Sequence, residues 1–296
     1  MNSTPQQLAD LAAERAVRGE VRIGKAKTVY WRYAATEASQ GTLVMVHGYR
    51  GNHLGLAAIA GALPQFDVIV PDLPGFGESE PIERHDIANY SEWLRAFVEN
   101  LAKPDSIVLA HSFGTIVAAS AAAQGMTNPL VLLNPISVAG RAGIAALRQS
   151  GVDFFNWLTG NLPAPAGKAL ASNWLAVQAM SSTLAKTGNK ELRAWIHQQH
   201  HENFSDFGDI RVATEGYVAS TTESVLPYAP SIAAPVLLIA GELDEITPLA
   251  NQREAASGYQ DASLAVIDGV GHLIHYEKPA EAAALVAVFS RKLAAR

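Results

Sequence analysis

The sequence has no cysteine, no long apolar run and no run of like charges. The absence of cysteine excludes disulfide bonds, and without a stretch of about 20 apolar residues no helix should span a membrane. The net charge of −6 is spread along the chain, so the charge pattern favours neither nucleic acid nor an anionic membrane as a partner. Asp10 and Glu14 interrupt the first apolar segment, which therefore does not match a signal peptide. We expect a soluble, cytoplasmic globular protein.

A chain of 296 residues can bury a core without disulfide support. After an amphipathic helix expected at 6–18, short apolar runs alternate with segments of helical periodicity. Such alternation is typical of an α/β fold, in which helices cover both faces of a mostly parallel central sheet. The expected strands are an edge hairpin at 21–23 and 28–33, followed by strands at 42–46, 67–70, 107–110 and 130–134.

The pattern changes between residues 135 and 230. Strand-like runs disappear there, and helix-like segments carry many large aromatic side chains. A buried strand then returns at 235–241 and another at 263–267, so the sheet resumes where it stopped. We therefore predict one core made of residues 1–134 and 231–296, with a helical cap of residues 135–230 inserted after the sixth strand.

A short apolar run ends at a serine between small residues. Residues 107–110 have the composition of a buried parallel strand, and a helix rich in small residues follows. Ala110 and Gly114 stand two residues before and two residues after Ser112. A strand that turns at once into a helix leaves room only for small neighbours, and it holds the central residue in a strained conformation with its side chain projecting from the sheet. Ser112 is therefore a candidate nucleophile.

Two further polar side chains, Asp244 and His272, each follow one of the last two predicted strands. Parallel strands bring their carboxyl ends to one edge of the sheet, so both side chains should meet Ser112 there. A histidine can take the proton of the serine, and a carboxylate fixes the tautomer of the histidine. The oxyanion that forms on the substrate would be bound by the backbone N–H groups of Tyr49 and Phe113.

Further motifs accompany the elbow at Ser112 and Asp244: His47-Gly48-Tyr49 with Gly51-Asn52, the loop 72–79, and Gly271-His272 with Glu277-Lys278-Pro279. Together these motifs resemble the α/β-hydrolase superfamily in its capped form. The resemblance covers about residues 20–135 and 231–294. It implies Ser112 as nucleophile, Asp244 as acid, His272 as base, and the cap as a lid over the substrate.

Two departures from the family pattern bear on the site. Ala110 replaces the usual glycine of the elbow, and we expect its methyl group to be tolerated because it is small. Asn134 follows the strand that carries the acid in some relatives, which favours Asp244 as the acid. A serine nucleophile in place of aspartate argues against the dehalogenase and epoxide hydrolase branches.

Several polar side chains near these motifs have competing interpretations. His47 is expected to hold its loop rather than to act in catalysis. Glu242 and Glu245 flank Asp244 and could replace it as the acid. His111, beside the nucleophile, could line the pocket or merely pack at the elbow.

Candidate substrate contacts are less sharply indicated. His275 is expected to be structural or to line the pocket, and Trp157 and Trp195 are candidates among the cap aromatics, because ligand sites are lined mainly by apolar groups. His197 and His201 share a helix face, as two metal ligands would, with His200 beside them. No acidic third ligand stands at a recognised spacing, so we predict no metal site.

The residues together predict a serine hydrolase that cleaves an ester, thioester or related acyl bond of a small, mostly apolar substrate through an acyl-enzyme on Ser112. This chemistry requires no metal or organic cofactor. An alcohol in place of water would make the same machinery an acyltransferase, and a C–C bond hydrolase would use the same triad. A ligand-binding protein of this fold with little turnover is the remaining alternative.

Overall fold

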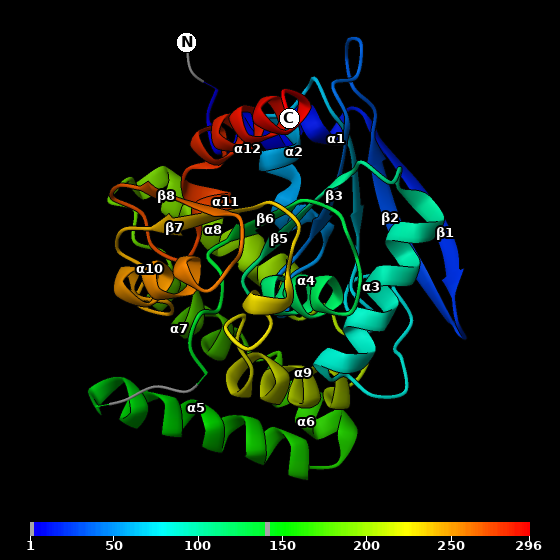
Figure 1. Cartoon of the computed structure of the whole chain (residues 1–296). Coiled ribbons are helices and arrows are strands. Elements are labelled where there is room, and N and C mark those ends of the chain that lie inside the picture. Colours follow the sequence, from blue (N-terminus) through cyan, green and yellow to red (C-terminus); the bar gives the residue numbers. More distant parts are fainter. Residues whose placement is uncertain (1–2, 140–142) are drawn as a thin grey trace.

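Eight strands form one sheet in the order β1-β2-β4-β3-β5-β6-β7-β8 (Figure 1). The computed structural model describes residues 3–139 and 143–296. Strand β2 (Ala26–Tyr33) is antiparallel to both its neighbours, β1 (Ala16–Ile23) and β4 (Asp67–Pro71). All other neighbouring strands are parallel, which confirms the predicted mostly parallel sheet. These strands are β3 (Thr42–Val46), β5 (Ile107–His111), β6 (Leu130–Leu133), β7 (Val236–Gly241) and β8 (Ala262–Ile267).

Successive residues of a central strand pack on opposite faces of the sheet. In β5, Val108 and Ala110 belong to the core that includes α3 (Ile87–Leu101) and α4 (Phe113–Ala123). Ile107 and Leu109 belong to the opposite core, which includes α1 (Pro5–Ala13), α2 (Ala57–Gly61) and α12 (Pro279–Ala294). Side chains alternate with a period of two along a strand. A strand buried on both faces is therefore apolar throughout, as the run at 107–110 is.

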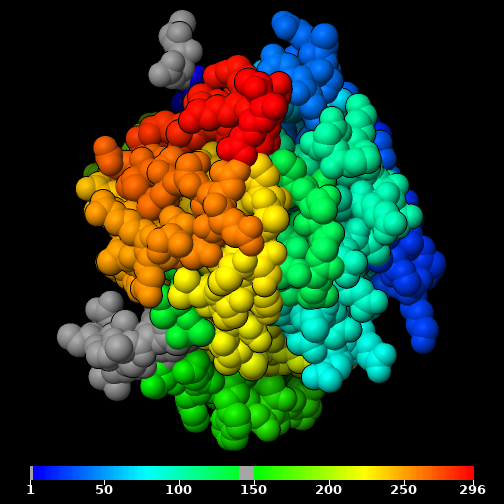
Figure 2. Space-filling view, viewed as in Figure 1, coloured from blue at the N-terminus to red at the C-terminus, as the bar shows by residue number. Residues whose placement is uncertain are grey.

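Among the described residues, five α-helices lie between β6 and β7 in the chain. They are α5 (Gly143–Asn161), α6 (Ala164–Ala171), α7 (Trp174–Leu184), α8 (Lys190–Asn203) and α9 (Ile210–Thr222). Helices α5, α6 and α9 form the end of the molecule opposite α12 in Figure 1, and Figure 2 shows the same segments, green to yellow, along its lower edge. Asn173, Asn189 and Asp209 cap three of these helices by accepting hydrogen bonds from backbone N–H groups. The division of the chain into core and cap stays a prediction.

The prediction of a helix at 6–18 is wrong for its C-terminal part. Helix α1 stops at Ala13, and Ala16 is already paired with Tyr33 across β1 and β2. The backbone of 16–18 gains ladder hydrogen bonds from the neighbouring strand, which outweighs the weak helical periodicity of this segment. The remaining short elements are η1 (His53–Leu56), η2 (Ala229–Ser231), α10 (Leu249–Ser257) and α11 (Ile274–Glu277). None of the described helices is both long and apolar enough to cross a bilayer.

Candidate active site

Strand β5 leads directly into α4 through Ser112. This residue has φ 52° and ψ −120°, so the strained serine expected at the elbow is present. Such a backbone conformation costs a residue other than glycine about 1–3 kcal/mol, and the surroundings must hold it in place. The first turn of α4 presses against the end of β3, since a Cβ atom at Gly114 would lie only 2.7 Å from the carbonyl oxygen of His47. Only glycine fits at that position.

Three side chains from three strand ends are joined by hydrogen bonds. The Nδ1 atom of His272 lies 2.8 Å from Oδ2 of Asp244, and its Nε2 atom lies 2.8 Å from Oγ of Ser112. An ionised carboxylate can only accept, so the imidazole carries its hydrogen on Nδ1, and its Nε2 lone pair accepts from the serine hydroxyl. The structure thus brings together the serine, the acid and the base candidates that the sequence indicated.

The carboxylate of Asp244 is surrounded by hydrogen-bond donors. Its Oδ2 atom accepts from His272, from Oγ1 of Thr247 at 2.8 Å and from Nδ2 of Asn134 at 2.9 Å. Its Oδ1 atom accepts from the backbone N–H groups of Ile246 and Thr247 at 2.8 and 3.1 Å. Burial acts to raise the pKa of this carboxyl, but attraction to His272 and the bonds from His272 and Thr247 outweigh it and lower the pKa to about 2. Asp244 is therefore ionised at neutral pH.

Two of these donors were missed by sequence reasoning. Asn134 was interpreted only as a vacant acid position, whereas its amide bonds to both Asp244 and the carbonyl oxygen of Gly271, at 2.9 and 3.2 Å. Its φ of 48° is tolerated by asparagine better than by most residues. The signal for Thr247 was a hydroxyl residue three positions after the acid, where a side chain can bond to a preceding turn.

The hydroxyl of Ser112 lines a cavity of about 760 Å³, which we call the serine cavity. Volumes of this order are typical of small-molecule sites. Tyr49 and Phe113, the predicted oxyanion donors, both border it. Phe113 is the first residue of α4, where helices leave N–H groups without an intrahelical partner. The lining is rich in large apolar side chains, among them Leu56, Phe155, Met180, Leu184, Phe204 and Tyr276.

His111 and His275 also line the serine cavity, with their ring centroids 3.9 Å apart. Burial, together with repulsion from neighbouring imidazoles, lowers the pKa of His111 to about 3 and that of His275 well below its usual range. Both rings are therefore neutral at pH 7. Trp157 and Trp195 are not among the residues that line this cavity. Trp157 is 60% exposed, and the ring of Trp195 lies edge-on against Tyr276 with centroids 5.5 Å apart.

The polar side chains with competing interpretations make contacts of their own. His47 accepts from the N–H of Leu73 at Nε2 and donates from Nδ1 to the carbonyl oxygen of Gly48, both at 2.8 Å, so it holds its loop. Glu242 accepts from the N–H of Gly269 at 2.9 Å, and Glu245 forms an ion pair with Lys186 at 3.0 Å. Neither glutamate is the partner of the histidine that contacts Ser112.

The histidine cluster of α8 bonds to α7. Ser181 Oγ lies 2.6 Å from Nδ1 of His197 and 2.7 Å from Nδ1 of His200. His201 bonds through Nε2 to the side-chain oxygen of Gln178 at 2.8 Å. These contacts tie two helices together.

The comparison with known families decides where the chain belongs. The family model described as "Alpha/beta hydrolase family" matches residues 43–285, which is more than half of the sequence. The chain belongs to the alpha/beta hydrolase family. This α/β-hydrolase is 29% identical, over 75% of its own length and 82% of the relative, to the pimeloyl-[acyl-carrier protein] methyl ester esterase of Shewanella oneidensis. It is 27% identical, over 83% of its own length and 85% of the relative, to the magnesium-chelatase 30 kDa subunit of Rhodobacter capsulatus.

A solved structure shares the fold. This α/β-hydrolase superposes on an esterase from Exiguobacterium antarcticum with a TM-score of 0.76, over 93% of its own chain and 100% of the other. The sequences are 15% identical, so the comparison concerns the architecture.

Two side chains, those of Tyr49 and Arg50, anchor the loop after β3 to the helices between β6 and β7. Arg50, with φ 58°, donates from Nε to the carbonyl oxygen of Phe204 at 2.7 Å and from Nη2 to that of Ala171 at 3.0 Å. These carbonyls stand at the C-terminal ends of α8 and α6, where helix dipoles are negative and carbonyls lack intrahelical partners. Tyr49 donates its hydroxyl to the carbonyl oxygen of Ala213 in α9 at 2.7 Å. Sequence reasoning missed Arg50.

Proposed function

We propose that this protein hydrolyses carboxylic esters through an acyl-enzyme on Ser112. The observation that carries the proposal is the hydrogen-bonded series from Asp244 through His272 to Ser112 at the wall of the serine cavity. The name of the Shewanella oneidensis relative and the esterase among the similar structures support an ester as the substrate. They favour this class over the acyltransferase, C–C hydrolase and binding-protein alternatives.

The first half-reaction transfers the acyl group to the enzyme. Oγ of Ser112 attacks the carbonyl carbon of the ester while Nε2 of His272 takes the hydroxyl proton. The imidazolium that forms is stabilised by the ionised carboxylate of Asp244. The bond to the alcohol oxygen then breaks, and His272 gives its proton to that oxygen as the alcohol leaves.

Water completes the cycle. A water oxygen attacks the carbonyl carbon of the acyl-enzyme, and Nε2 of His272 takes one of its protons. The bond to Oγ of Ser112 then breaks, the proton returns to the serine, and the carboxylic acid leaves. The N–H groups of Tyr49 and Phe113 are the proposed donors to both oxyanions, and each donor of this kind lowers the barrier by about 3 kcal/mol.

The helices between β6 and β7 are the proposed lid of the substrate site. Helices α5, α7 and α9 contribute Phe155, Met180 and Tyr217 to the lining of the serine cavity. Arg50 and Tyr49 tie α6, α8 and α9 to the loop that carries one proposed oxyanion donor. An apolar, partly enclosed site favours esters with apolar substituents, because burying them in the cavity removes apolar surface from water.

Hydrolysis of p-nitrophenyl butyrate by the wild type and by Ser112→Ala tests the proposal. We expect kcat to fall about 10⁶-fold in the variant, because the nucleophile is lost. Ser120→Ala is a matched control, since Ser120 is a buried serine of the same helix α4. It should leave kcat within about twofold of the wild-type value, because Ser120 is remote from the reacting atoms.

Two outcomes would contradict the proposal. Equal, substantial turnover by the wild type and Ser112→Ala would mean that another group carries the reaction. No turnover of any ester by the wild type, combined with saturable binding of one, would favour a ligand-binding protein of this fold.

A further inference from the structure

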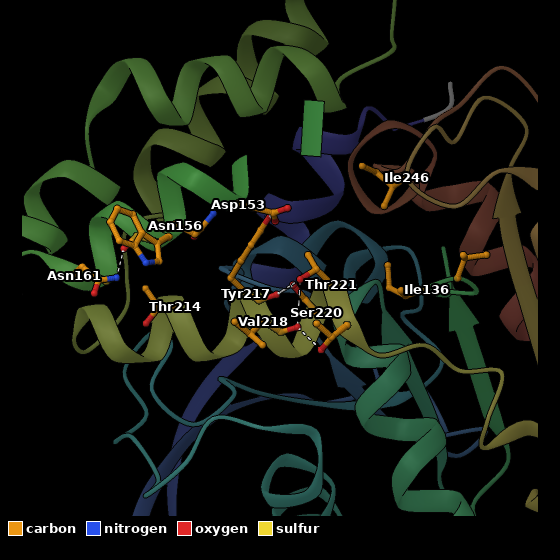
Figure 3. A pocket seen from close by; sticks show the side chains of 14 residues that line it. Ile136, Asp153, Asn156, Asn161, Thr214, Tyr217, Val218, Ser220, Thr221 and Ile246 are labelled. Atoms are coloured by element: carbon orange, nitrogen blue, oxygen red, sulfur yellow. Dashed lines mark hydrogen bonds between the residues drawn. The ribbon is translucent and has the colours of Figure 1, made fainter. Parts of the chain in front are cut away.

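A second cavity of about 600 Å³, which we call the side cavity, lies between α5 and α9 (Figure 3). It does not include Ser112, and its lining comes from these two helices together with Ile136, Val138 and Ile246. Six residues line both this cavity and the serine cavity, so the two spaces share a wall: Ile136, Asn156, Tyr217, Ser220, Thr221 and Ile246.

Tyr217 stands at the junction of the two cavities. Its hydroxyl donates to Oδ1 of Asp153 at 2.6 Å, which joins α9 to α5 (Figure 3). Its ring lies 6.2 Å from the ring of Tyr49, in the loop that borders the serine. Because Tyr217 lines both cavities, a molecule held at Ser112 can extend past this ring towards the side cavity.

The polar lining of the side cavity offers several hydrogen-bond acceptors. The hydroxyls of Thr214, Ser220, Thr221 and Thr222 donate to carbonyl oxygens one turn earlier in α9, at 2.8 to 3.0 Å. A hydroxyl has a single hydrogen, so each of these oxygens presents lone pairs to a ligand. The side-chain amides of Asn156 and Asn161, in the same lining, donate to carbonyl oxygens of α5 at 2.9 and 2.8 Å, so their oxygen atoms add further acceptors. A ligand that carries a hydrogen-bond donor therefore meets several acceptors among the described residues of this lining.

The rim of the side cavity is apolar. Trp157 and Val218 both line it, and they are 60% and 56% exposed. Large apolar side chains gathered at the mouth of a cavity commonly mark a binding site, because a bound apolar chain covers them. Ile136, Val138 and Ile246 continue this apolar surface along the wall.

We propose that the side cavity is a substrate subsite for the distal arm of the ester that reacts at Ser112. The arm is an extended, mostly apolar chain that carries a neutral hydrogen-bond donor, such as an amide N–H or a hydroxyl. This inference rests on the proposed ester hydrolysis and names its substrate class. The substrate is an elongated ester that occupies both cavities.

Val218→Trp tests the subsite, because Val218 lines the side cavity and not the serine cavity. Val218 is 56% exposed, so we expect α9 to tolerate the larger ring and the ring to take up space in the side cavity. The substrates are p-nitrophenyl butyrate, the p-nitrophenyl ester of a long amide-bearing acid, and the acetate of a long amide-bearing alcohol, so that either arm is tested. We expect kcat/KM for at least one long ester to fall about tenfold or more, and that for butyrate to stay within about twofold. The matched control, Val288→Trp on α12, is 40% exposed and lies outside both cavities.

Trp157→Ala is the second variant, and it removes a side chain from the same rim. It should raise KM for the long ester alone. The wild type should also prefer the amide-bearing ester about tenfold over an all-methylene chain of equal length.

The outcomes separate this inference from the function on which it rests. If both rim variants change the long and short esters equally, or change neither, the side cavity does not hold the arm, while ester hydrolysis stands. Preference for the all-methylene chain would overturn the assigned chemistry of the arm. A wild type that hydrolyses no ester would overturn both proposals.

Discussion

Asp244→Asn replaces one carboxylate oxygen by an NH2 group with almost no change in volume. In the wild type, Oδ1 accepts from the backbone N–H groups of Ile246 and Thr247, and these donors cannot become acceptors. The amide oxygen of the asparagine must therefore take the Oδ1 position. Its NH2 group is then placed at the Oδ2 position, where it faces Nδ1 of His272.

This orientation reverses the tautomer of the histidine. His272 must accept at Nδ1 and carry its hydrogen on Nε2, which can then no longer take the proton of Ser112. We expect kcat to fall about 10⁴-fold, which corresponds to about 5 kcal/mol of barrier. The variant also loses the charged carboxylate whose pKa is lowered from 3.8 to about 2, which represents about 2 kcal/mol of stability at neutral pH.

The assay is the kcat for p-nitrophenyl butyrate, with nitrogen NMR of the imidazole to identify its tautomer. Glu242→Gln and Glu245→Gln are matched controls, because each removes a neighbouring carboxylate that does not contact His272. Both should retain kcat within about twofold. An Asp244→Asn enzyme that keeps more than a tenth of the wild-type kcat, or a larger loss in either control, would refute the assignment of the acid.

Three further predictions concern stability, each measured by urea unfolding. Arg50→Met should lower the free energy of unfolding by about 3 kcal/mol, because two buried carbonyls lose their donor, and a loss below about 1 kcal/mol would contradict the anchoring role. Since the pKa of Asp244 is lowered on folding, its contribution is complete above about pH 4 and should disappear as the pH falls towards 2, a step that Asp244→Asn should lack. Burial lowers the pKa of His200 from 6.5 to about 3, so the unfolded chain binds this proton first. As the pH drops below 6.5, His200 alone should reduce the free energy of unfolding by up to about 1.4 kcal/mol per pH unit. His200→Phe should flatten that slope relative to a His201→Phe control, and equal slopes would contradict the prediction.

Much of the fold followed from local patterns. The apolar runs of β3, β5, β6 and β7 are buried on both faces, so their composition marks them without help from the rest of the chain. The edge strand β1 was harder to predict from the sequence, because it is partly exposed. Its residues 16–18 were expected to be helical. A half-exposed strand depends on its partner, and pairing with β2 is a contact that no local pattern contains.

The sequence by itself determined the candidate elbow and the order of the acid and the base. Ser112 lies between small residues at a strand end, and parallel strands bring Asp244 and His272 to the same edge, so local composition and topology were sufficient. Only the tertiary structure decided that Asn134 bonds to Asp244, that Arg50 anchors the loop after β3, and that a second cavity adjoins the first. These features arise between segments far apart in the chain. They depend on how helices pack against one another and on where the carbonyl groups at helix C-termini point. The periodicity of residues along a single helix does not determine this packing.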